Sequence, residues 1–507
     1  MPERPAPKKI APDRGRAALG IKGLDEILGG GLPRERIYLL DGEPGTGKTT
    51  AALQFLLAGR AKGEGGMYVA LSETTDELSG AAASHGWSLD GLVVVELSAL
   101  QEERSDEAYT LFHPAEVELQ HTIDAVLHEV ERHRPARVVF DSLSEMRMLA
   151  RDPLRFRRQI LALKQFFAGR DCTVVLIDDR THPAGDLQLQ SLAHGVIQLE
   201  HLAMEYGAER RRLQVTKLRG VRFHGGYHDF RIRTGGIEVF PRIIRHPDAP
   251  RRPPTVFESG SRELDELVGS GLPGGTSTLV MGSAGAGKSI LCMQYALRAA
   301  RSGVKTRVYL FDERTATALV RARSLDMDPA ESIANGTLSL RQIEPTEMSP
   351  GEFAQDIVCS VEEDGVGLIV IDSINGYLQA MPAERLLLVQ IHELLSYLAD
   401  RGVAMLMTLV QYGVFGGQVD ESAEVSYLAD TVLLLRYFEF SGSVRRAMSV
   451  VKKRSGPHES TIREFVIGAG GIRVGDPLRA FRGVLTGVPE YIGRIEPLLT
   501  ETPPQRD

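Results

Sequence analysis

The sequence predicts an α/β fold of two tandem domains, each a mostly parallel twisted sheet with helices on both faces. Short apolar runs alternate with longer stretches of helical periodicity, a pattern typical of parallel sheets that are covered on both sides. The same order of motifs occurs twice, at a constant offset of 240 residues between Gly42 and Gly282. Two such domains account for the 507 residues better than the roughly three that length alone suggests.

A proline-rich stretch separates the two copies. Residues 245–256 are polar and dense in proline, so we interpret them as an extended linker. They divide a first domain, residues 18–244, from a second, residues 257–492. Residues 1–17 are charged and contain no apolar segment, which predicts a disordered leader, and residues 493–507 are interpreted as a flexible tail.

In the first copy the predicted elements are a strand, a glycine-rich loop, a helix and two further strands. The apolar run Ile37 to Leu40 predicts the first strand, and Ala51 to Leu57 predicts the helix after the loop. Gly66 to Leu71 is the second predicted strand, and Arg137 to Asp141 is the third. These strands are continuously apolar, as expected when both faces of a sheet are buried.

The second copy repeats this order. Strands are predicted at Thr278 to Met281, Arg307 to Phe311 and Gly367 to Asp372, and a helix at Leu291 to Ala299. Upstream of each loop, the lead-in Gly-x-x-x-Leu-Asp-Glu with Gly-Leu-Pro recurs in the same register. Several motifs are not expected to recur at one constant offset by chance, so we interpret the two domains as repeats.

Both copies carry the full G-x-x-x-x-G-K-[ST] pattern between strand and helix. In this pattern backbone N–H groups wrap a β-phosphate, the lysine reaches the β and γ oxygens, and the next hydroxyl ligates Mg²⁺. The sequence therefore predicts two sites for ATP with Mg²⁺. The predicted nucleotide-binding residues are Gly45, Thr46, Gly47, Lys48, Thr49 and Thr50 in the first loop, and Gly285, Ala286, Gly287, Lys288, Ser289 and Ile290 in the second.

Acidic residues end the predicted strands beside each loop. Asp141 and Asp372 each close a third strand and precede a serine, which places them at the carboxyl edge, where ligands of such sheets bind. With Thr49 and Ser289, we predict that they hold Mg²⁺; the alternative is that each acid only caps the following helix.

Further acids follow the second strand of each copy. Glu73 in the first copy, and Asp312 or Glu313 in the second, are candidates for the base that orients the attacking water. Which of the two acids acts in the second domain stays open, and for each of the three the alternative is a solvated loop residue.

A short basic triplet occurs late in each copy, within strand-like sequence. A lysine and an arginine two positions apart on a strand share one face, so both could meet one triphosphate. The alternative is a solvated edge strand that avoids aggregation. The triplets are Lys217, Leu218 and Arg219, and Lys452, Lys453 and Arg454.

Composition narrows the class of protein. A formal net charge of −8 disfavours a general nucleic-acid binder, and no apolar stretch is long enough to span a membrane. The three cysteines, Cys172, Cys292 and Cys359, lack metal-ligand spacing and suit a reducing cytoplasm. His128 and His133 are five residues apart, which turns them away from a shared helix face.

These motifs together make the chain resemble the double-domain KaiC-type ATPases, a branch of the RecA/DnaB superfamily that includes circadian-clock proteins. The resemblance covers about residues 18–492. Besides both loops, both Asp-Ser pairs and the duplicated lead-in, it includes Ser84-His85-Gly86-Trp87, Lys217-Leu218-Arg219-Gly220, Gly235 to Pro241, Ile462 to Phe465, Phe481-Arg482-Gly483 and Gly487-Val488-Pro489. It implies tandem RecA-like P-loop NTPase domains, and it adds Ser84 to the predicted nucleotide-binding residues.

The resemblance also implies an assembly and a second activity. It implies a two-tiered hexamer with ATP between subunits, in which both basic triplets and Arg446 reach the nucleotide of a neighbouring subunit. Clock members phosphorylate an adjacent Ser-Thr pair in the second domain. Ser426 matches that serine, but Tyr427 replaces the threonine, so a single acceptor is retained.

Other departures from the clock members are specific. Ser72 replaces the first of two glutamates in the first domain, Asp312 replaces glutamate in the second, and Leu325 stands where an aromatic residue could cover the adenine. We see no case for circadian timing.

The resulting hypothesis is a cytoplasmic, ring-forming ATPase that hydrolyses ATP slowly, with Ser426 autokinase activity, and signals to a protein partner not yet known. One alternative is a DNA-processing motor of the RecA/DnaB type, although the loops Thr181 to Gln190 and Tyr412 to Glu424 lack the lysine and arginine that a pore loop requires. The other is a ring in which nucleotide only stabilises assembly.

Overall fold

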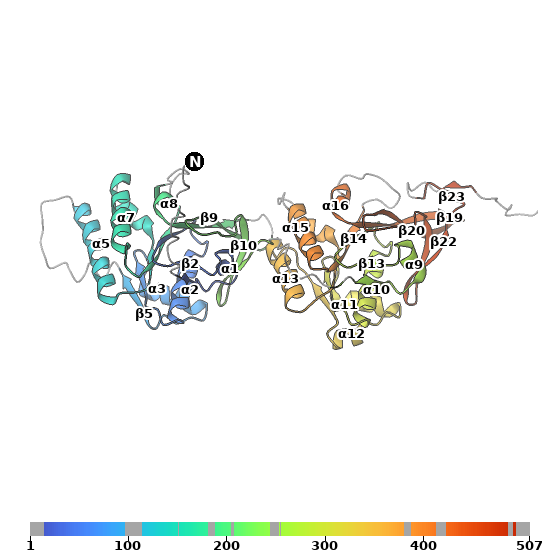
Figure 1. Cartoon of the computed structure of the whole chain (residues 1–507), viewed down its shortest axis with the longest axis horizontal. Helices are drawn as coiled ribbons and strands as arrows, with labels where there is room; N and C mark the ends of the chain where they lie inside the picture. The colour runs from blue at the N-terminus through green and yellow to red at the C-terminus, as the bar shows by residue number, and fades with distance from the viewer. Residues whose placement is uncertain are drawn as a thin grey trace, which may run out of the picture. The chain divides into compact units, whose positions relative to one another are not determined.

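The computed structural model describes residues 15–96, 114–150, 152–180, 188–203, 207–243, 253, 255–379, 387–411, 422–484 and 490–492. The chain divides into two compact units, with the division between Arg242 and Ile243. Each unit contains one large sheet with helices packed against it (Figure 1).

The first unit is built on a nine-stranded sheet of order β11-β10-β9-β8-β3-β7-β6-β4-β5. Neighbours from β8 through β5 pair in parallel, whereas β9, β10 and β11 extend the sheet in antiparallel fashion. The strands are β3 (Ile37–Gly42), β4 (Gly66–Ala70), β5 (Leu92–Glu96), β6 (Arg137–Asp141), β7 (Thr173–Asp178), β8 (Gly195–Leu202), β9 (Arg210–Leu218), β10 (Tyr227–Arg233) and β11 (Gly236–Phe240).

Helices cover both faces of this sheet. One face packs Tyr38 and Leu40 of β3 against α2 (Lys48–Arg60) and α3 (Thr75–Ser84). The other face packs Ile37 and Leu39 against α5 (Pro114–His133), α6 (Leu143–Ala150) and α7 (Pro153–Phe167). Alternate residues of one strand thus enter two separate cores, which is why the strand is apolar throughout. The remaining elements are β1 (Arg16–Ala17), α1 (Leu24–Ile27), β2 (Leu32–Pro33) and α8 (Gln188–Leu192).

The second unit repeats the architecture with the order β16-β15-β17-β18-β14-β19-β20-β21-β22. Its central strand β14 lies between β18 and β19, as β3 lies between β7 and β8. The strands are β14 (Ser277–Gly282), β15 (Thr306–Leu310), β16 (Leu338–Gln342), β17 (Leu368–Asp372), β18 (Ala404–Val410), β19 (Thr431–Phe440), β20 (Ser443–Lys453), β21 (Arg463–Gly468) and β22 (Gly471–Pro477).

Two helical layers cover the second sheet as well. Val280 packs with the layer of α9 (Arg262–Leu267), α10 (Lys288–Arg301) and α11 (Thr315–Ser324). Leu279 packs with the layer of α13 (Pro350–Glu362), α14 (Ile374–Gln379) and α15 (Leu387–Asp400). The smaller elements are β12 (Val256–Phe257), β13 (Leu272–Pro273), α12 (Ala330–Ala334), α16 (Ser422–Leu428), β23 (Phe481–Arg482) and β24 (Glu490–Tyr491).

The predicted fold class is confirmed: each unit is a mostly parallel α/β sheet covered on both faces. The helices after the loops are longer than predicted and begin at Lys48 and Lys288 themselves. Gly47 (φ 95°) and Gly287 (φ 111°) precede these lysines in left-handed conformations, which residues with a Cβ rarely adopt. The loops therefore turn directly into helix N-termini, where backbone N–H groups are free to bind an anion.

Candidate functional site

The first glycine-rich loop connects β3 to α2 and folds around its own lysine. Lys48 is only 6% exposed, and its ammonium donates to the carbonyl oxygens of Gly42 (2.8 Å) and Glu43 (2.7 Å). Thr46 donates to the same Glu43 carbonyl (2.8 Å). A Cβ on Gly47 would lie 2.6 Å from Ile232 Cδ1, so the loop packs closely against β10. The loop is thus a compact backbone cradle with a buried cation.

The second loop has the same construction between β14 and α10. Lys288 is also 6% exposed and donates to the carbonyl oxygens of Gly282 (3.0 Å) and Ser283 (2.9 Å). Ala286 is fully packed into the core, at 1% exposed. A Cβ on Gly285 would lie 2.9 Å from the Tyr437 hydroxyl, so the tyrosine borders this loop.

Asp141 ends β6 beside the first loop and is 8% exposed. Its Oδ2 accepts hydrogen bonds from the Thr49 hydroxyl (3.0 Å) and from the Tyr68 hydroxyl. Burial raises the pKa of Asp141, while these hydrogen bonds act to lower it. One carboxylate next to one hydroxyl fits Mg²⁺, which keeps most of its water and takes few protein ligands.

Asp372 ends β17 in the second unit but has a different partner. Its Oδ1 accepts a hydrogen bond from the Thr408 hydroxyl (2.5 Å), and within the described chain no hydrogen bond joins Asp372 to Ser289. Thr408 lies on β18, where the strand register of the first unit places the apolar Ile177. The predicted Ser289 and Asp372 pair therefore occupies the expected strand and loop, without the direct contact seen in the first unit.

Glu73 follows β4 and is half-buried beside Asp141. Burial raises its pKa first, and the nearby carboxylates of Asp141, Glu77 and Asp179 raise it further. A carboxyl group that retains its proton to higher pH is also a stronger base once it is ionised. Glu73 thus has the environment of a proton acceptor.

The two candidate acids of the second unit are held differently. Asp312 accepts a hydrogen bond from the hydroxyl of Ser373 (2.5 Å), the residue directly after Asp372. Glu313 instead pairs with Arg321 of α11 (2.6 Å). Asp312 is therefore the acid directed to the end of β17, and Glu313 is held by a cation of the next helix.

Each basic triplet caps the end of a short helix in its own unit. Lys217 donates to the carbonyl oxygens of Gln190 (2.6 Å) and Ser191 (3.3 Å), and Arg219 to that of Ser191 (3.0 Å). These carbonyls lie in α8. A cation at a helix C-terminus is stabilised by the helix dipole and by the free carbonyls.

The second triplet repeats this geometry on α16. Lys452 donates to the carbonyls of Ser426 (2.9 Å) and Tyr427 (3.1 Å), and Arg454 to that of Tyr427 (2.9 Å). The middle residues, Leu218 and Lys453, point elsewhere: Leu218 is buried in the core, and Lys453 donates to the Val268 carbonyl. The first and third residues of each triplet thus share a face, as predicted, and Ser426 lies in the helix that they cap.

Two further predicted residues have local partners. Arg446 stacks over the Tyr437 ring, with its guanidinium 5.4 Å from the ring centroid. The Ser84 hydroxyl donates to the Ala81 carbonyl of its own helix (2.7 Å), and it is His85 that contacts Thr50 of the first loop, at 3.4 Å. The motif that holds both residues was identified from the sequence, but the contacting side chain was not.

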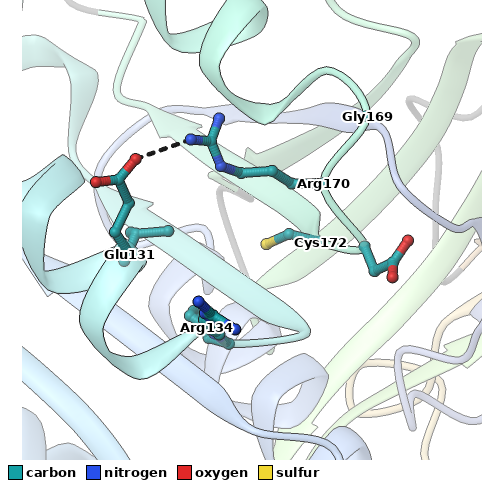
Figure 2. A pocket seen from close by; sticks show the side chains of 8 residues that line it. Glu131, Arg134, Gly169, Arg170 and Cys172 are labelled. Atoms are coloured by element: carbon teal, nitrogen blue, oxygen red, sulfur yellow. Dashed lines mark hydrogen bonds and ion pairs between the residues drawn. The ribbon is translucent and has the colours of Figure 1, made fainter.

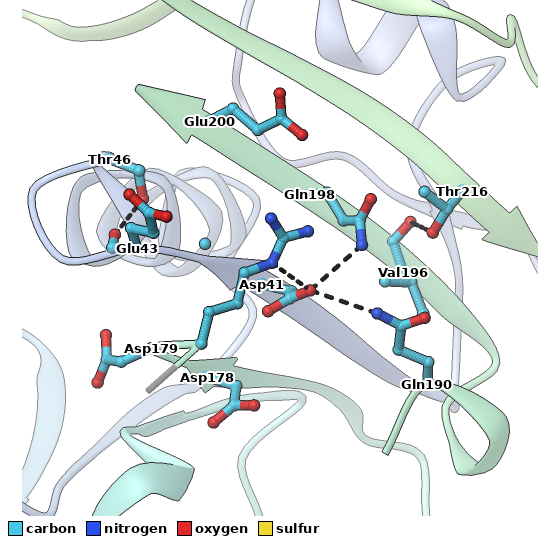
Figure 3. A network of polar contacts seen from close by, with 12 residues as sticks. Asp41, Glu43, Thr46, Asp178, Asp179, Gln190, Val196, Gln198, Glu200 and Thr216 are labelled. Carbon is cyan, nitrogen blue, oxygen red and sulfur yellow. Dashed lines mark hydrogen bonds and ion pairs between the residues drawn. The ribbon is translucent and has the colours of Figure 1, made fainter. Parts of the chain in front are cut away.

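A polar network that was not predicted from the sequence lies at the carboxyl edge of the first sheet (Figure 3). Asp41 of β3 is 3% exposed, and its Oδ2 accepts from Arg180 (3.0 Å), Gln198 (3.3 Å) and Gln190 (3.5 Å). Next to Arg180, Asp179 forms an ion pair with Lys48 (2.9 Å). The sequence does contain a feature that indicates this network: the strand Thr173–Asp178 ends in an acidic residue. The same feature, an acid at a strand end, identified Asp141.

A pocket of about 550 Å³ lies at the opposite, amino edge of this sheet (Figure 2). Arg170 at its rim pairs with Glu131 (2.8 Å) and stacks on Phe166. Burial raises the pKa of the Cys172 thiol to about 12, which keeps it protonated and unreactive. The pocket lies at the edge of the sheet opposite the first glycine-rich loop. We therefore assign the candidate functional site to the loop region and not to this pocket.

The described residues were compared with the requirements of a metal-binding cluster and of a membrane-spanning helix. Within it, no group of three or more His, Cys, Asp or Glu side chains is arranged to hold a metal ion by itself. No helix in the same residues combines the length and apolarity needed to cross a bilayer.

Fold and site together define a class: tandem α/β domains, each with a glycine-rich loop around a buried lysine and an acidic strand end beside it. Comparison with known proteins narrows the class. A family model described as "ATPase: KaiC" matches residues 17–243 and again residues 257–479. The chain therefore belongs to the KaiC ATPase family, and the predicted resemblance is confirmed.

Similar proteins cover nearly the whole chain. The circadian clock oscillator protein KaiC of Parathermosynechococcus lividus is 27% identical over 483 residues, which are 93% of this chain and 88% of that protein. The circadian clock protein KaiC3 of Synechocystis sp. is 26% identical over 490 residues, covering 94% and 95%. KaiC of Synechococcus elongatus is 27% identical over 487 residues, covering 93% and 91%.

Proposed function

We propose that this protein is a ring-forming ATPase that binds ATP with Mg²⁺ in both units, hydrolyses it slowly, and passes the result to a protein partner as a signal. The observation that carries the proposal is the contact between Thr49 and Asp141 (3.0 Å) beside the buried Lys48. It joins, in one place, a phosphate-binding cation and the two ligand types that Mg²⁺ takes in such sites. When bound, Mg²⁺ would supply neutralising charge to the β- and γ-phosphates.

In the first unit Glu73 would accept a proton from the attacking water while the water oxygen bonds to the γ-phosphorus. The bond from that phosphorus to the β,γ-bridging oxygen breaks, and ADP and phosphate leave. In the second unit we assign this role to Asp312, because Glu313 is paired with Arg321. Aspartate has a shorter reach than glutamate, which supports slow turnover in that unit.

The proposed assembly places each ATP between two copies of the chain. Lys217 and Arg219 would reach the first-unit nucleotide of a neighbour, and Lys452, Arg454 and Arg446 the second-unit nucleotide. Cations supplied across an interface stabilise the charge that develops on the γ-phosphoryl group. In a single copy the triplets instead cap α8 and α16, so assembly would need to release these contacts. A hexamer is the expected ring.

Ser426 is the proposed phosphoacceptor. It lies in α16, the helix capped by Lys452, so movement of that lysine to a neighbour's nucleotide would free the end of the helix that carries the serine. The Ser426 oxygen would attack the γ-phosphorus of ATP, its proton would pass to Asp312, and ADP would leave.

The experiment follows γ-labelled ATP with Mg²⁺ and the purified full chain, measuring free phosphate and protein-bound label together. Lys48→Ala, Lys288→Ala and Ser426→Ala are measured in parallel. We expect free phosphate that falls in each lysine variant, and bound label that disappears in Lys288→Ala and Ser426→Ala. Free phosphate without bound label would support the proposed ATPase activity and contradict the proposed autokinase activity. Neither signal, with nucleotide still bound, would show that the nucleotide only stabilises the ring.

A further inference from the structure

The first unit contains an acidic side chain that contacts its phosphate-binding lysine. Asp179 directly follows β7 and is 26% exposed, and its Oδ1 lies 2.9 Å from the ammonium of Lys48, which is 6% exposed. The other carboxylate oxygen accepts from Ser144 of α6 (3.2 Å). The carboxylate is thus fixed by a second element while it neutralises the lysine.

The second unit has no equivalent carboxylate. Strand β7 pairs with β3 so that Asp178 lies opposite Asp41, and β18 pairs with β14 so that Leu409 lies opposite Met281. The residue after Asp178 therefore corresponds to Val410. Among the described residues, Lys288 forms no ion pair, and its contacts are the two loop carbonyls. The two lysines are equally buried, so the difference lies in the partner and not in solvent access.

A carboxylate on this lysine competes with the ligand that the lysine serves. The β- and γ-phosphates of a nucleotide need the Lys48 ammonium, so binding must first separate it from Asp179. A negative charge that stays beside the loop also repels the phosphates. Both effects weaken binding in the first unit, and neither operates on Lys288.

We propose that Asp179 is an affinity-setting residue of the first nucleotide site, which occupies Lys48 in the empty site and makes that unit bind ATP and ADP more weakly than the second. This inference rests on the proposed function, because it assumes that both loops bind nucleotide. It adds a physical reason for the two units to respond to different nucleotide concentrations. Asp179 is a positioning residue here, since it acts through Lys48.

The test uses the full chain carrying Lys288→Ala, so that first-unit binding is measured alone. A fluorescent ADP analogue with Mg²⁺ is titrated into this protein and into the same protein with Asp179→Asn, Asp179→Glu or Asp171→Asn. Asn keeps the size and loses the charge, Glu keeps the charge, and the exposed Asp171 lies at the other end of the same strand. We expect Asp179→Asn to bind about three- to tenfold more tightly, the range that a partly buried ion pair supports. Asp179→Glu should stay close to the parent, and Asp171→Asn unchanged.

Kinetics separate this role from a role in the chemical step. With Asp179→Asn the KM for ATP should fall while kcat changes much less, because the lost interaction belongs to the empty site. The reciprocal variant, Val410→Asp in a Lys48→Ala chain, should weaken binding in the second unit.

Unchanged or weaker binding by Asp179→Asn would overturn the inference, as would a loss of kcat at constant KM, which would place Asp179 in the chemistry. A parent protein that binds no nucleotide through Lys48 would instead overturn the proposed function.

Discussion

At Glu73 the same burial that suits a base is unfavourable for folding. Burial and three neighbouring carboxylates raise the pKa of this side chain, so folding without ligand disfavours its ionised form relative to the unfolded chain. A group whose pKa is raised by folding contributes stability below its unfolded pKa and loses it as pH rises through the folded value. The ionised form of Glu73 therefore lowers the stability of the fold, and a residue kept at such a cost is typical of functional sites.

We therefore predict that Glu73→Gln separates activity from stability. First-unit ATP hydrolysis, measured in a Lys288→Ala chain, should fall by about 100-fold, as expected for loss of a general base. The urea midpoint at pH 7.5 should stay equal or rise. Trp87, the single tryptophan of the chain, packs against the core of the first unit and reports its unfolding by fluorescence.

The pH profile gives a second measurement on the same variant. As pH falls through the raised pKa of Glu73, the base becomes protonated, so the parent rate should decline at a pH above the ordinary glutamate value of 4.5. Glu73→Gln should lack this acidic decline. The control is Asp76→Asn, an exposed acid three residues away. A Glu73→Gln protein that keeps full activity would remove Glu73 from the mechanism.

At the scale of elements, the start of β6 depends on a buried arginine. Arg137 has no exposed side-chain surface, and it pairs with Glu64 (2.6 Å) and donates to the carbonyls of Ala18 (2.6 Å) and Phe55 (2.7 Å). It thereby connects four separate segments of the first unit. The second unit places Leu368 at the same register position, so the fold itself does not require a charge there.

We predict that Arg137→Leu destabilises the first unit by about 2–3 kcal/mol, because removal of one partner leaves Glu64 and two carbonyls without their donor. Arg34 still pairs with Glu64, which keeps the loss below that of an isolated buried charge. The measurement is urea unfolding followed by Trp87 fluorescence. Arg132→Leu, at a residue whose side chain is 68% exposed, should change stability by less than about 0.5 kcal/mol. Equal effects of the two variants would contradict the argument.

The elements that could be predicted from the sequence are those that form because of their own residues and immediate neighbours in the chain. The strand Arg137–Asp141 was predicted to the residue because its apolar run and its final acid are both visible in the sequence. The partners of the acids could not be predicted, because they depend on strand register. In the sequence Thr408 is an ordinary β-branched strand residue, yet in the structure its hydroxyl donates to Asp372. Asp179 was not predicted as a site residue, because the strand that precedes it, Thr173–Asp178, was not among the predicted strands.

At the scale of the whole molecule, the two units share a fold but differ in the polarity of one sheet edge. The first unit places Asp41, Asp178 and Asp179 at the carboxyl ends of adjacent strands, where the second unit has apolar residues, Met281, Leu409 and Val410. Gln190 of α8 donates to Asp41, while its carbonyl accepts from Lys217. Contacts thus run without a break from the edge beside the first loop to the proposed intersubunit cations.

This arrangement makes assembly and hydrolysis testable together. In a Lys288→Ala chain, we predict that Lys217→Ala with Arg219→Ala lowers first-unit ATP hydrolysis by about 100-fold, since these cations would act on the γ-phosphoryl group of a neighbour. The exposed Arg222 provides the control, and Arg222→Ala should stay within about twofold of the parent. Loss of the α8 cap costs only about 1 kcal/mol, so particle size with ATP, measured by light scattering, should be retained.

Mixing decides whether the cations act within a chain or between chains. A chain with Lys48→Ala has an inactive first loop but keeps Lys217 and Arg219, whereas the double variant keeps the loop and lacks the cations. If each site is built from two copies, mixed rings contain some sites with an intact loop from one chain and intact cations from the other. The activity of the mixture should then exceed the sum of the activities of the two separate proteins. With random equal mixing, half of the subunits carry an intact loop and half of their neighbours carry the cations, so activity should approach about a quarter of that of the parent. Activity equal to the sum would show that each chain completes its own site, and the proposed assembly would then have no catalytic role.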